Sequence, residues 1–401
     1  PHATNDGDAL MKILYFSPHP HINMAAPSGP GTHIREVIEG FESEGHEVIR
    51  LIAGGEELNA TPSIQYKRRS WKRFIPSIVW ETLRDVNMMR ADKQIEKQLS
   101  QLIAREQPDM IYERSCYGMG AGLRASSAAG IRYVVEMNAP YPEEKEAMQG
   151  KSLLSFLGRR HEKMQVENAW RTVVVSSAMK EYLLKKTNVD SKKIIIVPNA
   201  VNPAHVKVNP ENELAIREQY GLKSEHLVFG FVGSIFPYHG VDRMIDSFEK
   251  LEKKHPAIRM LIVGDGEVLP ALKARVHALQ LSDKIHFTGN VPHRNVYDYL
   301  SLMDIAVMAK SNWYGSPVKI FEYGAMQRAI IAPDVVPVRD VMIDRTHGLL
   351  IDEDSNSLLH AMSYMIEHPA ERLRMAGTFH DKVMNEHTWQ KMAKHILEHC
   401  E

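Results

Sequence analysis

Short apolar runs alternate with amphipathic segments along almost the whole chain. The first run, 12–17, is bounded by prolines, and the segment after it places Ile34, Val37 and Ile38 on one face of a helix. A helix stop and a second apolar run follow within 45–52. Continuous apolar runs are typical of parallel strands that are buried on both faces. The pattern therefore predicts strand, helix, strand units and a parallel sheet.

The same alternation continues toward the C-terminus in two halves. A stretch rich in proline and asparagine, 198–212, interrupts it and is typical of a linker. We expect an N-terminal α/β domain over 11–200, a C-terminal α/β domain over 201–385, and a last amphipathic helix within 386–401. The expected strands lie at 12–17, 45–52, 108–115, 130–138, 172–177 and 192–197 before the linker, and at 227–233, 260–266, 284–289, 305–308 and 329–332 after it.

Composition agrees with two ordinary globular domains. The chain has 401 residues, of which 44% are hydrophobic and 25% charged, and its formal net charge is -1. A neutral chain lacks the field of a nucleic-acid-binding protein, so we expect no nucleic-acid partner. Cys116 and Cys400 lie far apart in the sequence, which favours a reducing compartment, and we predict a cytoplasmic protein. Residues 1–10 are polar and precede Met11, and we interpret them as the remnant of an expression tag.

Two basic segments are candidates for contact with anionic surfaces. Segment 66–76 interleaves lysines and arginines with aromatic and aliphatic residues, and 151–163 mixes leucine and phenylalanine with basic residues. Such segments can lie on lipid head groups, so 66–76 is a candidate for peripheral contact with the inner face of a membrane. The alternatives are a solvated loop for the first segment and an ordinary amphipathic helix for the second.

A loop-to-helix junction in the second half carries the clearest chemistry. Gly315 and Ser316 indicate a turn, and Pro317 suits the first turn of a helix. A helix N-terminus binds phosphate well, and Ser316 and Lys319 add a hydroxyl group and a cation. Glu322 follows one turn later, where a carboxylate would meet the ribose hydroxyls of a nucleotide. The alternative is an ordinary capped helix with a solvated lysine and glutamate.

In the first half, polar residues gather where the expected strands end. In open parallel sheets, ligands meet the carboxyl ends of the strands. We therefore expect Ser17 to His19, Glu113-Arg114 and Glu136 to Asn138 to share one crevice. Gly29 and Gly31 lie in a glycine-rich loop before the first helix, where glycine permits close approach of a ligand or simply makes a turn.

Taken in order, these motifs resemble one enzyme family. The motifs are the glycine-rich loop, Val197 to Val201, Gly233 to Gly240, Leu261 to Gly266, Phe287 to Gly289, and Ser316 to Tyr323. Together they are similar to the retaining glycosyltransferases of family 4, also called glycosyl transferases group 1. The resemblance implies the GT-B fold, in which two Rossmann-like, doubly wound parallel-sheet domains face a cleft. It also implies that the C-terminal domain holds a nucleotide sugar and that the last helix, 386–401, crosses back to the N-terminal domain.

The resemblance also assigns individual residues. Glu322 matches the glutamate that holds the ribose, whereas Tyr314 stands where the family has another glutamate. Ser234 and His239 stand where the family has its arginine and lysine, which leaves Lys319 as the main charge on the diphosphate, with His239 helping when protonated. Asn138 replaces an acceptor-side histidine, and the amides from Gly315 to Val318 remain for phosphates and sugar hydroxyls. The implied donor site comprises Gly29, Gly31, Gly233, Ser234, His239, Gly264, Val291, Tyr314, Gly315, Ser316, Pro317, Val318, Lys319 and Glu322, and the implied catalytic group comprises Asn138, Glu136, Lys319 and Glu113.

The resemblance implies transfer of a sugar, with retention, from a nucleoside-diphosphate sugar to a hydroxyl group. A UDP-sugar is favoured as donor, and the acceptor is a glycan, a lipid-linked molecule or a small molecule. The donor is a co-substrate and no cofactor is expected. We recognise no metal-binding Asp-x-Asp motif of the other common transferase fold, so we expect metal-independent activity.

Three alternatives stay open at this point. One is a sugar-nucleotide epimerase of the same fold, and another is a non-catalytic homologue, suggested by the residues at Tyr314, Ser234 and Asn138. The third is a dinucleotide-dependent dehydrogenase, suggested by Gly264-Asp265-Gly266, although these glycines do not complete the six-residue fingerprint.

Overall fold

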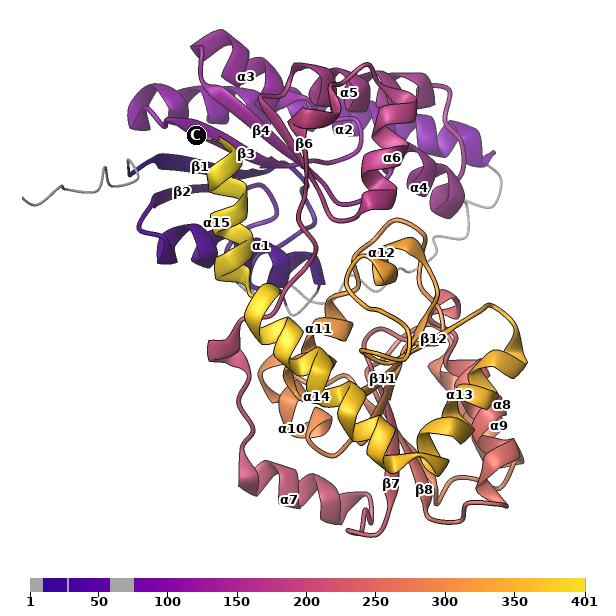
Figure 1. The fold of residues 1–401 in the computed structure, drawn as a ribbon. Helices are drawn as coiled ribbons and strands as arrows, with labels where there is room; N and C mark the ends of the chain where they lie inside the picture. The colour runs from indigo at the N-terminus through magenta and orange to yellow at the C-terminus, as the bar shows by residue number, and fades with distance from the viewer. Residues whose placement is uncertain (1–9, 27–28, 58–75, 401) are drawn as a thin grey trace, which may run out of the picture. The chain divides into compact units, whose positions relative to one another are not determined.

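The chain forms two compact α/β units. The computed structural model describes residues 10–26, 29–57 and 76–400, and these divide into Pro1–Val197 with Gln390–Glu401, and Pro198–Trp389 (Figure 1). All but Leu10 of the expected tag remnant, and all but Pro76 of the basic segment 66–76, lie outside the described residues. No helix among the described residues is both long enough and apolar enough to cross a bilayer.

The first unit is built on a six-stranded sheet of order β2-β1-β3-β4-β5-β6, with every pair parallel. Its strands are β1 (Lys12–Ser17), β2 (Glu47–Ile52), β3 (Met110–Arg114), β4 (Arg132–Met137), β5 (Arg171–Val174) and β6 (Ile194–Ile196). Its helices are α1 (Gly29–Ser43), α2 (Ser77–Glu106), α3 (Ala121–Ala129), α4 (Tyr141–Gln149), α5 (Ser155–Asn168), α6 (Ser177–Lys186), the short η2 (Ser191–Lys193) and α15 (Trp389–Cys400). The strand order reverses between β1 and β3.

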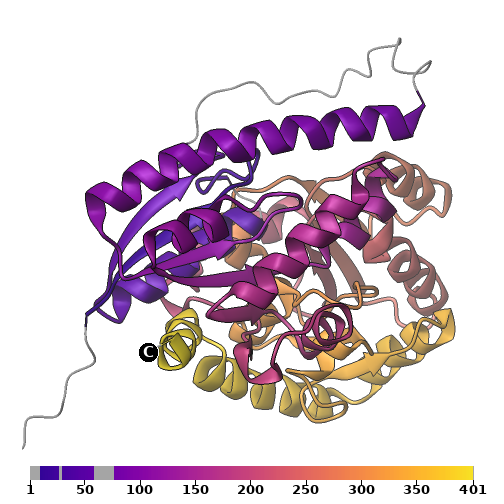
Figure 2. The same ribbon diagram turned by 90° about the horizontal axis from the view of Figure 1, so that it is seen from above.

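Helices cover both faces of this sheet, with α2 and α3 on one face and α1 on the other (Figure 2). The C-terminal helix α15 is fixed to the sheet by two arginines, because Arg132 donates to the carbonyl of Cys400 (2.8 Å) and Arg171 to that of His399 (2.7 Å). With helices on both faces of the sheet, the central strand β1 is buried, and residues 13–16 have no exposed surface. That burial is why the strand has a continuous apolar sequence.

The second unit repeats this architecture with the order β12-β11-β10-β7-β8-β9, again all parallel. Its strands are β7 (Leu227–Val232), β8 (Ile258–Val263), β9 (Ile285–Gly289), β10 (Ile305–Val307), β11 (Ala329–Pro333) and β12 (Leu349–Ile351). Its helices are α7 (Pro210–Gln219), α8 (Val241–Glu252), α9 (Leu269–Ala278), α10 (Val296–Leu300), α11 (Val318–Ala325), α12 (Val336–Arg339), α13 (Ser355–Glu367) and α14 (Pro369–Glu386), with η3 (Pro203–His205), η4 (Pro237–His239) and η5 (His293–Asn295). The order reverses between β7 and β10, as in dinucleotide-binding sheets.

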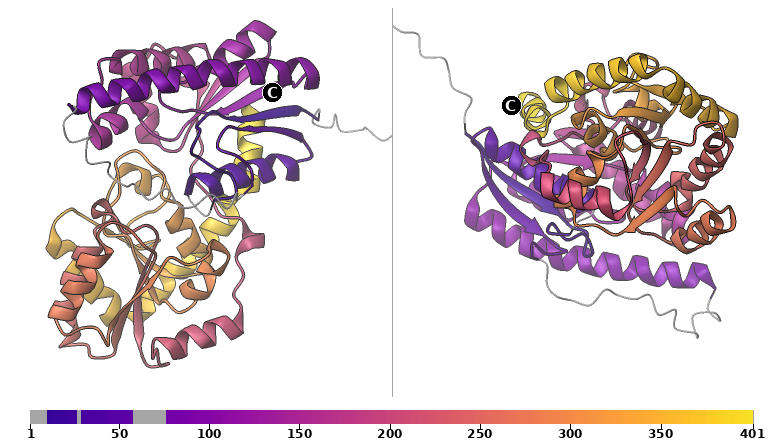
Figure 3. Two further views of the ribbon diagram at one scale, coloured as in Figure 1. Left: turned by 180° about the vertical axis from the view of Figure 1, so that it is seen from behind. Right: turned by 90° about the horizontal axis from the view of Figure 1, so that it is seen from below.

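Helices lie on both faces of the second sheet (Figure 3). Strand β7 contributes side chains to two hydrophobic cores in this unit. Phe229 and Phe231 pack into the core that α8, α9 and α13 cover, whereas Val228 and Val232 pack into the core under α10, α11 and α14. The predicted α/β fold with two doubly wound parallel sheets is therefore confirmed. Ligands of such sheets bind at the carboxyl ends of the strands beside the reversal in strand order.

Candidate functional site

In the second unit, the end of β7 and the start of α11 meet at the reversal point of the sheet. The amide of Val232, the last residue of β7, donates to the hydroxyl of Tyr323 on α11 at 3.0 Å. Next comes Gly233, whose φ of 137° is a conformation that residues with a side chain rarely adopt. This hydrogen bond fixes the first turns of α11 beside the turn at Gly233.

Two asparagines hold the loop before α11. The side-chain oxygen of Asn312 accepts from the amides of Tyr314 (3.2 Å) and Gly315 (2.6 Å). Asn199, in the linker, donates its amide to the hydroxyl of Ser316 (3.0 Å) and its side chain to the carbonyl of Ser316 (2.6 Å). In the free protein the Gly315 amide, which we expected to take a phosphate, already donates to Asn312.

The amides of Val318 and Lys319 are the donors that remain. Pro317 is the N-cap of α11, has no N–H group, and no side chain caps the helix. Neither of these two amides donates to an acceptor among the described residues. The N-terminus of α11 thus keeps the unsatisfied donors and the positive dipole end that bind an anion.

Lys319 adds a buried charge at this point. Its ammonium group lies 4.4 Å from the centre of the Phe231 ring and 3.1 Å from the position that a Cβ atom on Gly233 would occupy. The ammonium nitrogen is buried and has no hydrogen-bond partner within the described part of the chain. Burial lowers the pKa of Lys319 to about 8, although the nearby Glu322 carboxylate opposes the shift. An unpaired buried cation is costly, and an anionic ligand would remove that cost.

His239 is neutral beside this cation. Burial and the charge of Lys319 lower the pKa of His239 to about 4. Its Nδ1 atom contacts the carbonyl oxygen of Ser234, so Nδ1 carries the proton and donates. The sequence interpretation allowed His239 to help hold a diphosphate when protonated, but in the free protein it is not protonated near neutral pH.

Three other predicted donor residues, Glu322, Gly264 and Val291, are also described by the structure. Glu322 is 8% exposed and lies one turn beyond Lys319 on α11. Gly264 lies behind Gly233, since a Cβ atom on Gly264 would fall 2.0 Å from the Gly233 carbonyl oxygen. The absence of a side chain at Gly264 is therefore explained by the packing of two turns. Val291 is half-buried against the core under α10 and α11.

In the first unit, Glu136 is the centre of a buried polar network at the carboxyl ends of β3 and β4. One of its oxygens lies 2.7 Å from Nε2 of His33 and accepts from Arg114 (2.9 Å) and from the side chain of Asn138. The other accepts from the hydroxyl of Tyr112 at 2.7 Å. Glu136 is 1% exposed, and although burial raises its pKa, His33 and Arg114 hold that pKa well below its ordinary value. Glu136 is thus an ionised group that orients its neighbours.

Glu113 does not belong to this network. Successive residues of a strand point to opposite faces, and Glu113 accepts from Tyr133 (2.7 Å) and Gln165 (3.1 Å) on the face that α3 and α5 cover. Burial raises the pKa of Glu113 to about 8, with the Tyr133 hydrogen bond opposing it. The expectation that Glu113 shares one crevice with Arg114 and Glu136 is wrong.

Three further polar atoms at the reversal point of the first sheet are buried without a partner among the described residues: Tyr15 Oη, Ser17 Oγ and Arg114 Nε. Tyr15 and Ser17 are on β1, and Arg114 ends the neighbouring strand β3. Buried polar atoms are normally satisfied, so these three are groups to which water or ligand hydroxyl groups could bind.

Gly29 and Gly31 do not lie in a loop before the first helix, as expected, but in the first turn of α1. A Cβ atom on Gly31 would fall 2.6 Å from the carbonyl oxygen of Ala26, whereas one on Gly29 would meet nothing within 4 Å. Gly31 therefore allows the preceding segment to pack against the first turn of α1, and Gly29 is not constrained by packing.

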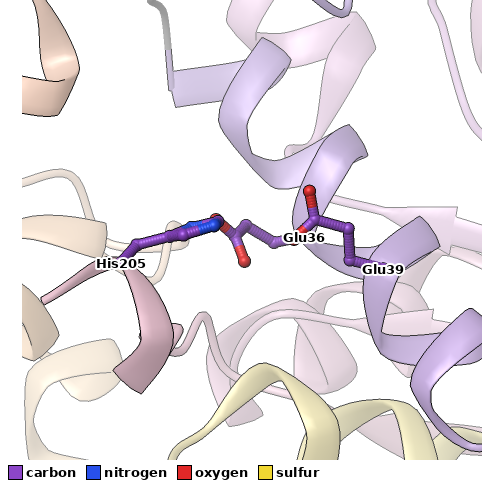
Figure 4. A group of neighbouring side chains, drawn as sticks. All are labelled: Glu36, Glu39 and His205. Carbon is purple, nitrogen blue, oxygen red and sulfur yellow. The ribbon is translucent and has the colours of Figure 1, made fainter.

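Helix α1 also carries two carboxylates one turn apart, Glu36 and Glu39 (Figure 4). Glu36 is 5% exposed, and Glu39 is exposed. His205, drawn in the same figure, belongs to the second unit. Two carboxylates within one unit are too few ligands to assign a metal site.

Comparison with known proteins identifies the family. A model described as "Glycosyltransferase Family 4" matches residues 27–205, and one described as "Glycosyl transferases group 1" matches residues 212–378. The chain is a member of the family 4 glycosyltransferases. Together the two matches span both units, and the GT-B fold that the sequence motifs implied is confirmed.

Solved structures of this fold cover nearly all of the chain. Anabaena Alr3699/HepE, solved in complex with UDP, superposes with a TM-score of 0.71 at 14% identity, covering 97% of this chain and 99% of that one. A sucrose-phosphate synthase from Thermosynechococcus elongatus superposes with a TM-score of 0.72 at 15% identity, covering 97% and 98%.

Curated relatives match over shorter stretches. The phosphatidylinositol N-acetylglucosaminyltransferase GPI3 subunit of Saccharomyces cerevisiae is 22% identical over 231 residues, which is 58% of this chain and about half (50%) of that protein's length. The alpha-D-kanosaminyltransferase of Streptomyces kanamyceticus is 23% identical over 268 residues, or 65% of this chain and 69% of that protein.

Sequence reasoning missed three residues that shape the two sites. Asn312 has a detectable signal, since an asparagine two or three residues before a glycine turn commonly binds the amides that follow. Asn199 lies in the motif used to recognise the linker, but its contact with Ser316 spans 117 residues. His33 and Glu136 are separated by more than one hundred residues in the sequence, and no local sequence pattern predicts their contact.

Proposed function

We propose that this glycosyltransferase moves a sugar, with retention, from a nucleoside-diphosphate sugar to an acceptor hydroxyl, and that the second unit binds the donor. The observation that carries the proposal is the buried ammonium group of Lys319, which has no hydrogen-bond partner among residues 10–26, 29–57 and 76–400, at the N-terminus of α11, where no side chain caps the helix. A diphosphate satisfies this cation and the amides of Val318 and Lys319 together. The carboxylate of Glu322, one turn further along, is assigned to the ribose hydroxyls.

Catalysis follows from where negative charge develops. When the bond between sugar and diphosphate breaks, the leaving diphosphate gains charge, and a preorganised cation and helix N-terminus stabilise it. Because Lys319 and α11 supply this stabilisation, the proposed reaction needs no metal ion. Turnover that is lost on exhaustive chelation and restored by a divalent ion would contradict this part.

The acceptor is assigned to the first unit. Asn138 and Arg114, both oriented by Glu136, lie at the strand ends. The hydroxyl groups of Tyr15 and Ser17, on the neighbouring strand β1, have no hydrogen-bond partner in the described part of the chain. In this assignment Glu136 is a positioning residue, because its oxygens are already engaged. Relatives point to more than one class of acceptor, since one is named for phosphatidylinositol and another for teichuronic acid biosynthesis.

UDP-sugars are the favoured donors because a structural neighbour was solved with UDP and, in another crystal, with UDP-glucose. The test is thermal stabilisation by UDP, GDP, TDP and ADP and by their sugars. We expect one nucleotide series to raise the unfolding temperature of the wild type and to leave that of Lys319→Met unchanged. Lys284→Met is the matched control, because Lys284 is also partly buried in the second unit but is paired with Glu252 at 2.6 Å.

The products of turnover then distinguish a transferase from an epimerase. A transferase releases nucleoside diphosphate quickly only when an acceptor is present, and the linkage formed retains the anomeric configuration of the donor. Conversion of the donor sugar without an acceptor would favour an epimerase. No stabilisation by any nucleotide would contradict the donor site.

A further inference from the structure

An exposed apolar face lies on helices α2, α4 and α5 of the first unit. Large apolar side chains project from the first turns of α2, from the end of α4 and from the start of α5, elements labelled in Figure 1. They are Ile78 (39% exposed), Val79 (43%), Leu83 (50%), Met148 (64%), Leu153 (65%) and Phe156 (62%). We call these six residues the apolar face. A cluster of this kind marks an interaction site more often than a lone exposed side chain does.

The apolar face is held rigidly from below. Asp85 on α2 is 4% exposed and binds the ammonium group of Lys145 on α4 at 2.6 Å. Asp85 also accepts from the hydroxyl of Ser152, and the amide of Leu153 donates to the hydroxyl of Thr82 at 3.0 Å. One buried carboxylate therefore fixes α2, α4 and the loop before α5, and that loop is held with Leu153 outward.

Side chains next to one another in the loop before α5 and in its first turn differ in exposure. Leu154 is partly buried and lines a small pocket with Met88 and Met89 of α2, while Leu153 before it and Phe156 after it are exposed. Leu153 and Phe156 are therefore exposed on an element whose neighbouring residue packs against α2.

Two cations lie beside Leu153 and Phe156 in the sequence. Arg84 pairs with Glu81, Lys145 with Asp85 and Arg159 with Glu146, so these three pairs are neutral. Lys151 and Arg160 are exposed, and neither forms an ion pair with an acidic residue in the described part of the chain. A surface with protruding apolar side chains and unpaired cations matches a bilayer that carries anionic head groups.

We propose that the apolar face docks the chain on an anionic lipid bilayer, with Leu153 and Phe156 entering the head-group region and Lys151 and Arg160 contacting lipid phosphates. Apolar burial and charge then act together, as peripheral membrane attachment requires. This proposal does not depend on the glycosyl-transfer reaction. The apolar face is a different surface from the basic segment 66–76, of which the structure describes only Pro76. The contacts that hold the apolar face are defined.

The test is sedimentation of the purified chain with vesicles. One set consists of phosphatidylcholine and phosphatidylglycerol in equal parts, and the other of phosphatidylcholine alone. We expect the wild type to sediment with the first set only and to be released by high salt. The double variant Leu153→Glu with Phe156→Glu should bind at least about tenfold more weakly, and Lys151→Gln with Arg160→Gln should lose about fivefold for each charge removed.

The matched control is Leu214→Glu with Leu373→Glu, which makes the same chemical change at two exposed positions of the second unit (56% and 66% exposed). This control should sediment like the wild type. Unfolding temperatures of all variants, measured alongside, verify that they are folded. A wild type that stays in the supernatant with both vesicle sets would overturn the proposal and leave a protein partner for this face. Equal binding of the Leu153/Phe156 variant and the control would overturn it too.

Discussion

The carboxyl ends of the strands in the two sheets differ in how their buried charged groups are paired. In the first unit, Arg114 and His33 meet the carboxylate of Glu136, which also accepts from Tyr112 and Asn138. In the second unit, the ammonium group of Lys319 is buried over Phe231 without a hydrogen-bond partner among the described residues. At the first edge the buried charges are paired, and at the second the buried ammonium group has no hydrogen-bond partner in the part of the chain that the structure describes.

This difference indicates what each edge binds. A satisfied ionic network gains little from a further charge but holds hydrogen-bonding groups in fixed positions, which suits an acceptor with hydroxyl groups. An unpaired buried cation destabilises the free protein and gains most from an anionic ligand. The four predictions that follow test this contrast, from the largest expected effect to the smallest.

Removal of the central carboxylate should damage the first edge most. Glu136→Ala leaves Arg114 and His33 buried without their anion, and we expect the free energy of unfolding to fall by about 3–5 kcal/mol. Urea denaturation measures this loss. The control is Glu146→Ala, which breaks the more exposed pair with Arg159 and should cost no more than about 1 kcal/mol. A loss as small as that in Glu136→Ala would show that the network is not a stabilising unit.

Removal of the lone cation should have two opposite effects on the second unit. Lys319→Met relieves the burial of an unpaired charge, so we expect the free protein to gain about 1–2 kcal/mol of stability. The same change should weaken UDP binding by about 2–3 kcal/mol, because a charge-assisted contact to the diphosphate is lost. Denaturation and calorimetry measure the two effects, and a destabilised variant that binds UDP normally would refute both.

Gly233→Ala should disturb the same site indirectly. A Cβ atom there would be 3.1 Å from the Lys319 ammonium group, and the φ of 137° is unfavourable for alanine. We expect a stability loss of about 1–3 kcal/mol and a several-fold weaker affinity for UDP. Gly289→Ala, at a φ of 74° with no atom within 4 Å of the added Cβ, should leave UDP affinity unchanged. Equal affinity in both variants would separate Gly233 from the donor site.

Glu113→Gln should act only on stability, and gradually with pH. Because burial raises the pKa of Glu113 to about 8, the folded protein holds a proton that the unfolded chain has lost. Stability from this group is therefore complete below the ordinary glutamate pKa and is lost as pH rises toward about 8, by about 1 kcal/mol per pH unit. Denaturation across this range should show a slope in the wild type that is absent from Glu113→Gln, while transfer activity is retained. Loss of turnover in this variant would return Glu113 to the catalytic group.

The fold was predictable because its signals are local. Buried parallel strands require apolar runs, and β1 and β7 display them within six residues each. The separation of Glu113 from Arg114 was also within reach, since neighbours on a strand point to opposite faces. The capture of the Gly315 amide by Asn312 is similarly a local turn motif.

The contacts that could not be predicted from the sequence join residues that are far apart along the chain. The pairing of His33 with Glu136 joins α1 to β4, and the contact of Asn199 with Ser316 joins the linker to the loop before α11. Sequence motifs pointed to Lys319 as a cation near a phosphate, but only the position of Phe231 and Gly233 shows that the cation is buried and unpaired. Affinity and pKa at this site arise from that burial.

The most direct test of the account is proton uptake when UDP binds. At a pH of about 8 the free protein carries a proton on roughly half of its Lys319 side chains, so an anion that contacts this group should draw in about half a proton. Calorimetry in two buffers with different ionisation enthalpies measures that uptake. We expect uptake in the wild type and in Lys284→Met and none in Lys319→Met. UDP binding without proton uptake in the wild type would contradict the assignment of Lys319 to the diphosphate.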